Sequence, residues 1–315
     1  MTEKTSPSLP ALIESEISRS VMAEAEALAS AILDAHGDAI SAIVFYGSCL
    51  RSGDPTGMLD FYVLVDDYAA YYGKSIPAFF NRVLPPNVSY WEIPGTPEPV
   101  RAKVAVISLT RFAASMRPEA VDTTMWARFA QPTALIYARD DAVRAQVVDA
   151  LADALATAVH WAAHLGPEKA RPEDYWSGLF RATYAAELRV ETQDRSSHII
   201  SADPERYAAL FRPALERAGI LWTEGEGEAL SPTITQEARE RGQKGWRSRR
   251  WKGKVLNISR LVKAAFTFEG GADYLAWKIE RHTGKALNLT PWQRRHPVLA
   301  APGVWLRLWR QGGFR

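Results

Sequence analysis

The sequence predicts a mixed α/β fold of the α+β kind, in which a sheet-containing domain precedes a mainly helical region. Short apolar runs rich in β-branched and aromatic residues alternate with helical patterns in the first 145 residues. Helical spacing dominates from residue 146 onward, and the end of the chain is rich in Arg, Lys and Trp. We therefore expect an α/β domain at 1–145, a helical domain at 146–240 and a basic C-terminal region at 241–315.

The expected elements follow one another without an internal repeat. Apolar side chains at helical spacing predict an amphipathic helix at 11–36 that ends near Gly37. Five apolar runs of strand length come next, and helical patterns at 110–117 and 118–130 separate the fourth run from the fifth. The strand runs are 42–46, 59–65, 88–93, 100–107 and 133–137. The later helices are expected at 146–165, 173–192, 204–219 and 255–281.

The composition is that of a globular protein, with 47% hydrophobic and 23% charged residues among 315. The single cysteine, Cys49, excludes an internal disulfide framework and fits a reducing compartment. No run approaches the roughly 20 apolar residues that span a bilayer, and the acid-rich N-terminus lacks a basic-then-apolar signal. We therefore expect a cytoplasmic location.

The formal net charge of +2 hides a strong asymmetry along the chain. Residues 241–315 carry 17 Lys and Arg against three acids, which leaves 21 basic and 33 acidic groups in residues 1–240. A basic end of this kind indicates an anionic partner, either nucleic acid or lipid headgroups.

A short amphipathic helix at 302–311 favours the lipid alternative. It begins at a proline and ends at two glycines, and its length of about 15 Å is too short to cross a membrane. Apolar and cationic side chains occupy opposite arcs, which is typical of a helix lying in the headgroup plane. A helix docked on its own domain is the alternative, whereas nucleic acid would leave the apolar arc without bases to stack on. The membrane-facing candidates are Trp305, Leu308 and Trp309, with Arg307 and Arg310 on the polar arc.

The most informative motif is Phe45-Tyr46-Gly47-Ser48, followed by Asp60 inside the next apolar run. Gly47 allows the backbone to approach a phosphate closely, and Ser48 offers a hydroxyl and an N–H to the same oxygens. Asp60 is a hard oxygen ligand suited to Mg²⁺ beside phosphates. Nucleotidyltransferases of the polymerase-β type hold a nucleoside triphosphate with such a turn and carboxylate. An ordinary hairpin turn is the alternative, and Tyr62 stands where a second acid is usual in such a site.

Lys103 and a histidine pair complete the candidate groups. Lys103 opens an expected strand, where it either faces solvent or neutralises charge in a triphosphate site. His160 and His164 are spaced i and i+4 on an expected helix, which suits zinc, but no third ligand is apparent and a structural role is expected.

Taken in this order, these segments resemble one family, the mitochondrial-type phosphatidate cytidylyltransferases, also called translocator assembly and maintenance proteins. The resemblance is carried by residues 45–48 and by Met58-Leu59-Asp60-Phe61 running to Val65-Asp66-Asp67. Weaker matches lie at 103–108 and 264–271, and the similarity is thin between 195 and 250. The family tends to have glycine where this chain has Cys49. A cysteine allows the backbone of the turn fewer conformations than glycine does.

The resemblance implies a polymerase-β-type nucleotidyltransferase domain, a smaller winged-helix-like helical domain and a membrane-associating C-terminal helix. It also implies a reaction in which CTP and phosphatidic acid give CDP-diacylglycerol and pyrophosphate with Mg²⁺. The family lacks the second acid, so Tyr62 agrees with membership. Without a mitochondrial presequence, the expected form is bacterial and peripheral on the inner face of the cell membrane.

The residue roles in this reading follow from charge and position. Asp60 holds Mg²⁺, the turn at Tyr46, Gly47 and Ser48 binds the nucleotide, and Lys103 stabilises charge in catalysis. Arg260 and Lys263 lie three apart on an expected helix and either contact the lipid phosphate or form a solvated face.

Three alternatives remain open. The fold could be a catalytically degenerate membrane-binding module, which Tyr62 motivates, or a nucleotidyltransferase acting on another acceptor. Nucleic-acid binding by residues 241–260 is a weaker possibility.

Overall fold

The computed structural model of the chain describes residues 7–96, 98–186, 199–283 and 289–295. The predicted helix at 302–311, with Trp305, Arg307, Leu308, Trp309 and Arg310, lies outside the described residues. Among the described residues, no helix is both long enough and apolar enough to cross a membrane.

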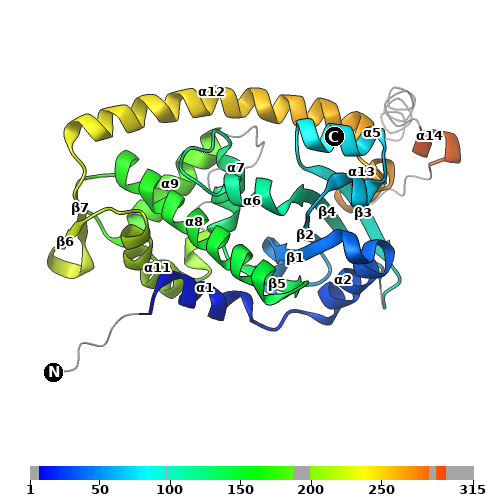
Figure 1. Ribbon diagram of the computed structural model, residues 1–315, viewed down its shortest axis with the longest axis horizontal. Coiled ribbons are helices and arrows are strands. Elements are labelled where there is room, and N and C mark those ends of the chain that lie inside the picture. The colour runs from blue at the N-terminus through cyan, green and yellow to red at the C-terminus, as the bar shows by residue number, and fades with distance from the viewer. Residues whose placement is uncertain (1–6, 97, 187–198, 284–288, 296–315) are drawn as a thin grey trace.

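A five-stranded mixed sheet lies in the first part of the chain, and all five predicted strands are confirmed (Figure 1). The strands are β1 (Ile40–Tyr46), β2 (Met58–Val65), β3 (Asn87–Ile93), β4 (Val100–Ser108) and β5 (Thr133–Ala138). Their order is β3-β4-β2-β1-β5, with β2 and β4 parallel and the other neighbours antiparallel. The mixed α/β class expected from the sequence is therefore present.

Both faces of the sheet are buried because successive side chains of a strand point to opposite sides. Ile43 and Phe45 of β1 pack on one side with α2, whereas Ala42 and Val44 join the core on the other side, with α7 and α8. Short helices complete the domain between the strands. The described α-helices up to residue 165 are α1 (Leu9–Ile17), α2 (Ala23–His36), α3 (Ser48–Ser52), α4 (Tyr68–Tyr72), α5 (Ile76–Val83), α6 (Leu109–Ser115), α7 (Thr123–Phe129) and α8 (Asp141–Leu165).

The single helix predicted at 11–36 is wrong, because the structure has two helices, α1 and α2, in this range. Between them the hydroxyl of Ser18 donates to the carbonyl of Glu14, a local bond that competes with helix propagation. The break lets α1 pack on α8 and α11 while α2 covers the opposite face of the sheet.

The second half of the chain is helical around the long helix α8. Helices α9 (Pro172–Ala186) and α11 (Pro204–Arg217) pack on α8, and a hairpin of β6 (Trp222–Glu224) and β7 (Leu230–Pro232) follows. One hydrophobic core runs from the sheet face through α8 into α9 and α11. The core therefore has no break at residue 145, where the first domain was expected to end.

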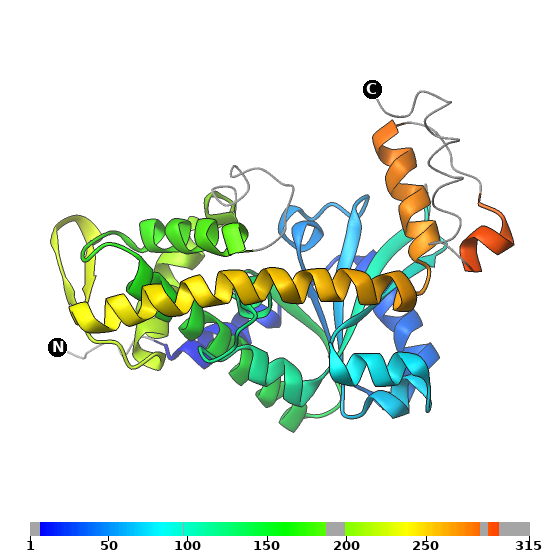
Figure 2. The ribbon, with the colours of Figure 1, turned by 90° about the horizontal axis from the view of Figure 1, so that it is seen from above.

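Helix α12 (Gln236–Thr267) spans the top of the molecule in Figure 1, and Figure 2 shows it crossing both halves. The helix predicted at 255–281 is in fact the end of α12 followed by α13 (Gly271–Thr283), with a turn at Gly270, whose φ is +70°. In this turn the carbonyl of Glu269 accepts a hydrogen bond from the N–H of Tyr90 at 2.9 Å. Helix α14 (Pro291–Arg295) is the last described element.

A buried ion pair joins α1, near the start of the chain, to α11 in its second half. Glu16 of α1 accepts from the guanidinium of Arg206 on α11 and from the backbone N–H of Thr133 on β5. Only 10% of the Glu16 side chain and 7% of the Arg206 side chain is exposed, so each charge depends on the other.

We expect Glu16→Ala to lower the free energy of unfolding by about 3–5 kcal/mol, because Arg206 then remains buried without its counter-charge. Glu14→Ala is the matched control, since its partner Arg144 and Glu14 itself are substantially exposed; its cost should be about 1 kcal/mol or less. Urea denaturation followed by circular dichroism measures both, and equal costs would contradict the argument.

The histidine pair lies on α8, with ring centroids 4.2 Å apart. Burial, followed by the charges of His164 and Arg249, lowers the pKa of His160 to about 4. The unfolded chain therefore takes up a proton at this residue between pH 6.5 and about 4, whereas the folded protein does not.

The folded protein should accordingly lose stability as the pH falls through this window. His160→Gln should reduce the difference between the free energies of unfolding at pH 7 and pH 5, measured by urea titration. An unchanged difference would show that His160 does not cause the acid sensitivity.

Candidate functional site

One row of residues crosses four strands and contains the carboxylate singled out in the sequence. Asp60 on β2 pairs in register with Tyr46 on β1 and with Lys103 on β4, and Lys103 pairs with Tyr90 on β3. Side chains in register on adjacent strands point to the same face, so the parallel pairing of β2 with β4 places a cation beside Asp60. We call these four residues the Asp60 row.

The turn after β1 brings backbone against the Asp60 carboxylate. Gly47 has a φ of +97°, which L side chains rarely adopt, and a β-carbon built on it would lie 2.8 Å from Oδ2 of Asp60. Glycine is therefore required here both for its backbone conformation and for the close approach of Asp60. Ser48 follows as the exposed first residue of α3.

The thiol of Cys49 packs beneath this turn. Its side chain is 4% exposed, and its Sγ donates to the carbonyl of Met58 at 3.3 Å. Burial, followed by the charge of Asp60, raises the pKa of the thiol. Cys49 therefore stays protonated at neutral pH and has the character of a packing residue.

Arg128 of α7 adds a second cation near the row. It donates from Nη1 to the hydroxyl of Tyr62 at 2.8 Å, and its guanidinium lies 5.4 Å from the ring centroid of Tyr46. Tyr62 lies on the same face of β2 as Asp60, and its ring is buried against Tyr46. The position where a second acid is usual is therefore filled by an aromatic side chain bonded to an arginine.

Aromatic residues of α13 cover the other end of the row. Nζ of Lys103 lies 4.4 Å from the ring centroid of Tyr274, and the guanidinium of Arg101 lies 5.9 Å from that of Trp277. A cation over the face of an aromatic ring is attracted to it electrostatically. Glu92 accepts hydrogen bonds from Arg101 and from the hydroxyl of Tyr90, which ties the edge strand to this cluster.

The donor set suits a Mg²⁺ ion that arrives with phosphates. In the described part of the chain, no group of three or more His, Cys, Asp and Glu side chains is arranged to hold a metal ion. Mg²⁺ commonly binds through one or two carboxylates plus substrate phosphates and waters. Asp60, with the Gly47 turn packed beside it, supplies one such carboxylate.

The predicted lipid-phosphate residues, Arg260 and Lys263, are engaged by protein groups. Arg260 forms an ion pair with Asp122 at 2.6 Å and donates to the carbonyl of Pro85. Nζ of Lys263, which is 7% exposed, donates to the carbonyls of Leu84 and Pro86, both at 2.6 Å. Neither side chain forms the solvated helix face that the sequence offered as the alternative.

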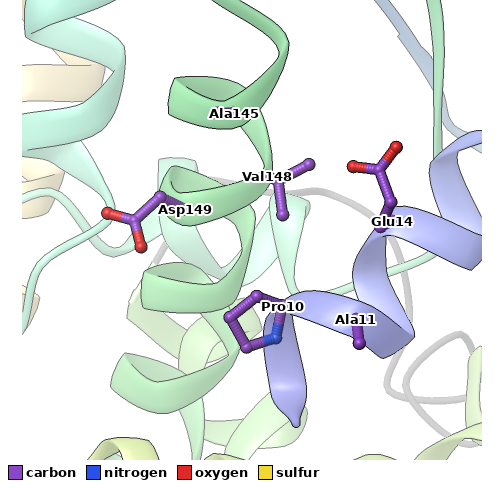
Figure 3. A pocket seen from close by; sticks show the side chains of 6 residues that line it. All are labelled: Pro10, Ala11, Glu14, Ala145, Val148 and Asp149. Carbon is purple, nitrogen blue, oxygen red and sulfur yellow. The ribbon is translucent and has the colours of Figure 1, made fainter. Parts of the chain in front are cut away.

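Two cavities lie away from the Asp60 row. A hollow of about 340 Å³ between α1 and α8 has a mostly apolar lining with two carboxylates at its rim (Figure 3). These carboxylates, Glu14 and Asp149, are already paired with arginines. A second cavity, of about 260 Å³, lies beside Arg260 and Ile107, which is at the opposite end of β4 from Lys103. The linings of these two cavities include no residue of the row.

Sequence reasoning singled out Asp60, Gly47 and Lys103, which the sheet brings together, but not Arg128, Tyr274 or the Arg101–Glu92 pair, which lie beside them. The alternation of Arg101 and Lys103 on one strand was a usable signal, because both must point to the same face. The sequence held no such signal for Arg128 and Tyr274, since each reaches the row from a helix whose position depends on the tertiary fold.

We expect Gly47→Ala to lower the free energy of unfolding by about 1–3 kcal/mol and to displace the Asp60 carboxylate, because the new β-carbon needs both a strained φ and the space of Oδ2. Gly178→Ala is the matched control on α9, where nothing lies within 4 Å of the added β-carbon. That control should be neutral or stabilise by up to about 1 kcal/mol. A Gly47 variant as stable as the control would contradict the close approach.

No protein-family model matches this chain, and a search of curated proteins gives no match either.

Proposed function

We propose that the chain is a Mg²⁺-dependent nucleotidyltransferase of the phosphatidate cytidylyltransferase type. The supporting observation is the juxtaposition of the Asp60 carboxylate with the Gly47 turn on one side and Lys103 on the next strand. This arrangement offers a carboxylate for the metal, a glycine turn packed directly against that carboxylate and a cation for charge. The resemblance of segments 45–48 and 58–67 to that family supplies the identity of the substrates.

In the proposed reaction, a phosphate oxygen of phosphatidic acid forms a bond to the α-phosphorus of CTP. The bond from that phosphorus to the bridging oxygen breaks, and pyrophosphate leaves with the electron pair. The attacking oxygen is already an anion, so no general base is needed. The main obstacle is the repulsion between two anions, which positioning and cationic side chains can offset.

The residues of the site have distinct roles in this proposal. Asp60 would hold Mg²⁺, which when bound neutralises phosphate charge and stabilises the leaving pyrophosphate. The turn at Tyr46, Gly47 and Ser48 would bind the triphosphate through backbone and hydroxyl groups. Lys103, held against Tyr274, would stabilise charge on the transferring phosphorus, and Arg128 is a further cation on the same face.

The lipid phosphate is better assigned to an exposed cation than to Arg260 or Lys263. Both would have to give up partners within the protein, and Asp122 would then be left as an unpaired acid among partly buried groups. Association with an anionic membrane surface would bring the acceptor to the site, with the segment around Trp305 and Trp309 as one candidate for contact.

We expect the purified protein with CTP, Mg²⁺ and phosphatidate-containing vesicles to form CDP-diacylglycerol and pyrophosphate, followed with α-labelled CTP. Asp60→Asn should reduce the rate by about 100-fold or more, since it removes the metal-binding charge. Asp38→Asn is the matched control, because Asp38 is an exposed acid near the other end of β1 and should leave the rate unchanged.

The outcomes separate the alternatives. Product formed without lipid would favour another acceptor. Absence of CTP binding by calorimetry, with the wild-type fold intact, would favour a degenerate binding module, as the aromatic residue at position 62 also suggests. No product from wild type across several acyl chains would overturn the proposal.

A further inference from the structure

Part of helix α12 reverses the usual arrangement of an amphipathic surface helix, in which cations face water and apolar side chains face the protein. Its cations Arg249, Arg260 and Lys263 point toward the protein, where they donate to backbone carbonyls of residues 84–86 and 118–120. Burial lowers the pKa of Lys263 to about 8 and also lowers that of Arg249. These three cations occupy the buried side of α12, so other residues form its solvent-facing side.

That opposite side is an exposed apolar stripe. Its members recur at spacings of three and four, so they lie on one arc of the helix. Phe266 is 77% exposed and Trp251 69%. The stripe consists of Trp251, Val255, Ile258, Leu261, Val262 and Phe266.

A second exposed apolar stripe lies on the neighbouring helix α5. Its side chains are spaced i, i+3, i+4 and i+7, whereas Ala78 and Asn81 on the other side of α5 are buried. Lys263 binds the carbonyl of Leu84 directly after α5, and Figures 1 and 2 both place α5 beside the C-terminal part of α12. The stripe consists of Ile76, Phe79, Phe80 and Val83. We call the two stripes together the α5–α12 face.

The charges around the α5–α12 face select its occupant. Residues 241–268 contain nine Lys and Arg and no acid. A second copy docked through α12 would bring two such helices together, and residues 296–315 add only further arginines without an acid. Five exposed cations of the same helix lie before the apolar stripe or among its first residues. They are Lys244, Arg247, Arg250, Lys252 and Lys254.

From these observations we propose that the α5–α12 face docks on an anionic phospholipid bilayer. The apolar stripes would enter the boundary between headgroups and acyl chains, with Trp251 at the interface and the cations among the anionic headgroups. An exposed apolar surface of this extent needs such a partner, since soluble monomers rarely expose one. Nucleic acid would pair with the cations but leave both stripes in water.

To test the proposal, Phe79→Cys and Val262→Cys are made separately in the full chain. Each new thiol is then labelled with an environment-sensitive fluorophore. Leu221→Cys is the matched control, because Leu221 is 75% exposed and lies outside both stripes. Labelling of wild type, whose Cys49 is buried, gives the background. Vesicles of phosphatidylcholine with phosphatidylglycerol are compared with phosphatidylcholine alone, without nucleotide.

We expect the labels at 79 and 262, but not at 221, to shift to the blue with the anionic vesicles. The triple variant Ile258→Ser/Val262→Ser/Phe266→Ser should weaken vesicle binding by about tenfold or more, with an unchanged melting temperature because all three side chains are exposed. Vesicle binding without a shift at 79 and 262 would assign attachment to another segment and overturn the proposal.

Three other outcomes would overturn it as well. A dimer in sedimentation equilibrium that the serine substitutions dissociate would make a second copy the occupant. Labels already shielded in the monomer without vesicles would show that the chain covers its own face, and absence of binding to any vesicle would leave an acidic protein as the partner. None of these measurements uses CTP, so failure of the proposed reaction and failure of the docking surface are distinguishable.

Discussion

The burial of α8 is the constraint on which the rest of the structure depends. This alanine-rich helix contacts the sheet at β1 and β5 and packs against α1, α7, α9, α11 and α12. Small side chains allow such close approach from several directions, and close-packed interiors leave little freedom for the neighbouring elements to shift. The strand ends that carry Asp60 and the helix that carries the apolar stripe are thus fixed to one core.

The strands were predictable because apolar runs of strand length with turn residues between them have few other solutions. Their pairing was not, and the site depends on the pairing. Lys103 becomes a neighbour of Asp60 only because β2 and β4 are adjacent and parallel, a contact between segments about 40 residues apart. Gly47 was singled out from the sequence for close approach to a phosphate, whereas in the structure its positive φ and the nearby Asp60 carboxylate are what require glycine.

The orientation of α12 shows where reasoning from the pattern of charge was insufficient. A basic helix is ordinarily expected to place its cations in water, and Arg260 and Lys263 were interpreted accordingly. Backbone carbonyls at the end of α5 instead provide acceptors that compensate for the lost hydration of these groups. Such acceptors arise from the tertiary arrangement of loops, which no local periodicity encodes.

The turn between α12 and α13 has a consequence for the solubility of the protein. Strand β3 lies at an edge of the sheet, where unpaired N–H groups can recruit strands from other molecules. The carbonyl of Glu269 accepts a hydrogen bond from one of these N–H groups, that of Tyr90, and the turn residue Gly270 packs against the same tyrosine. The connection between α12 and α13 therefore hinders edge-to-edge pairing of β3 with a strand of another molecule at this position. A chain ending before residue 269 would lose this hydrogen bond and expose the N–H of Tyr90.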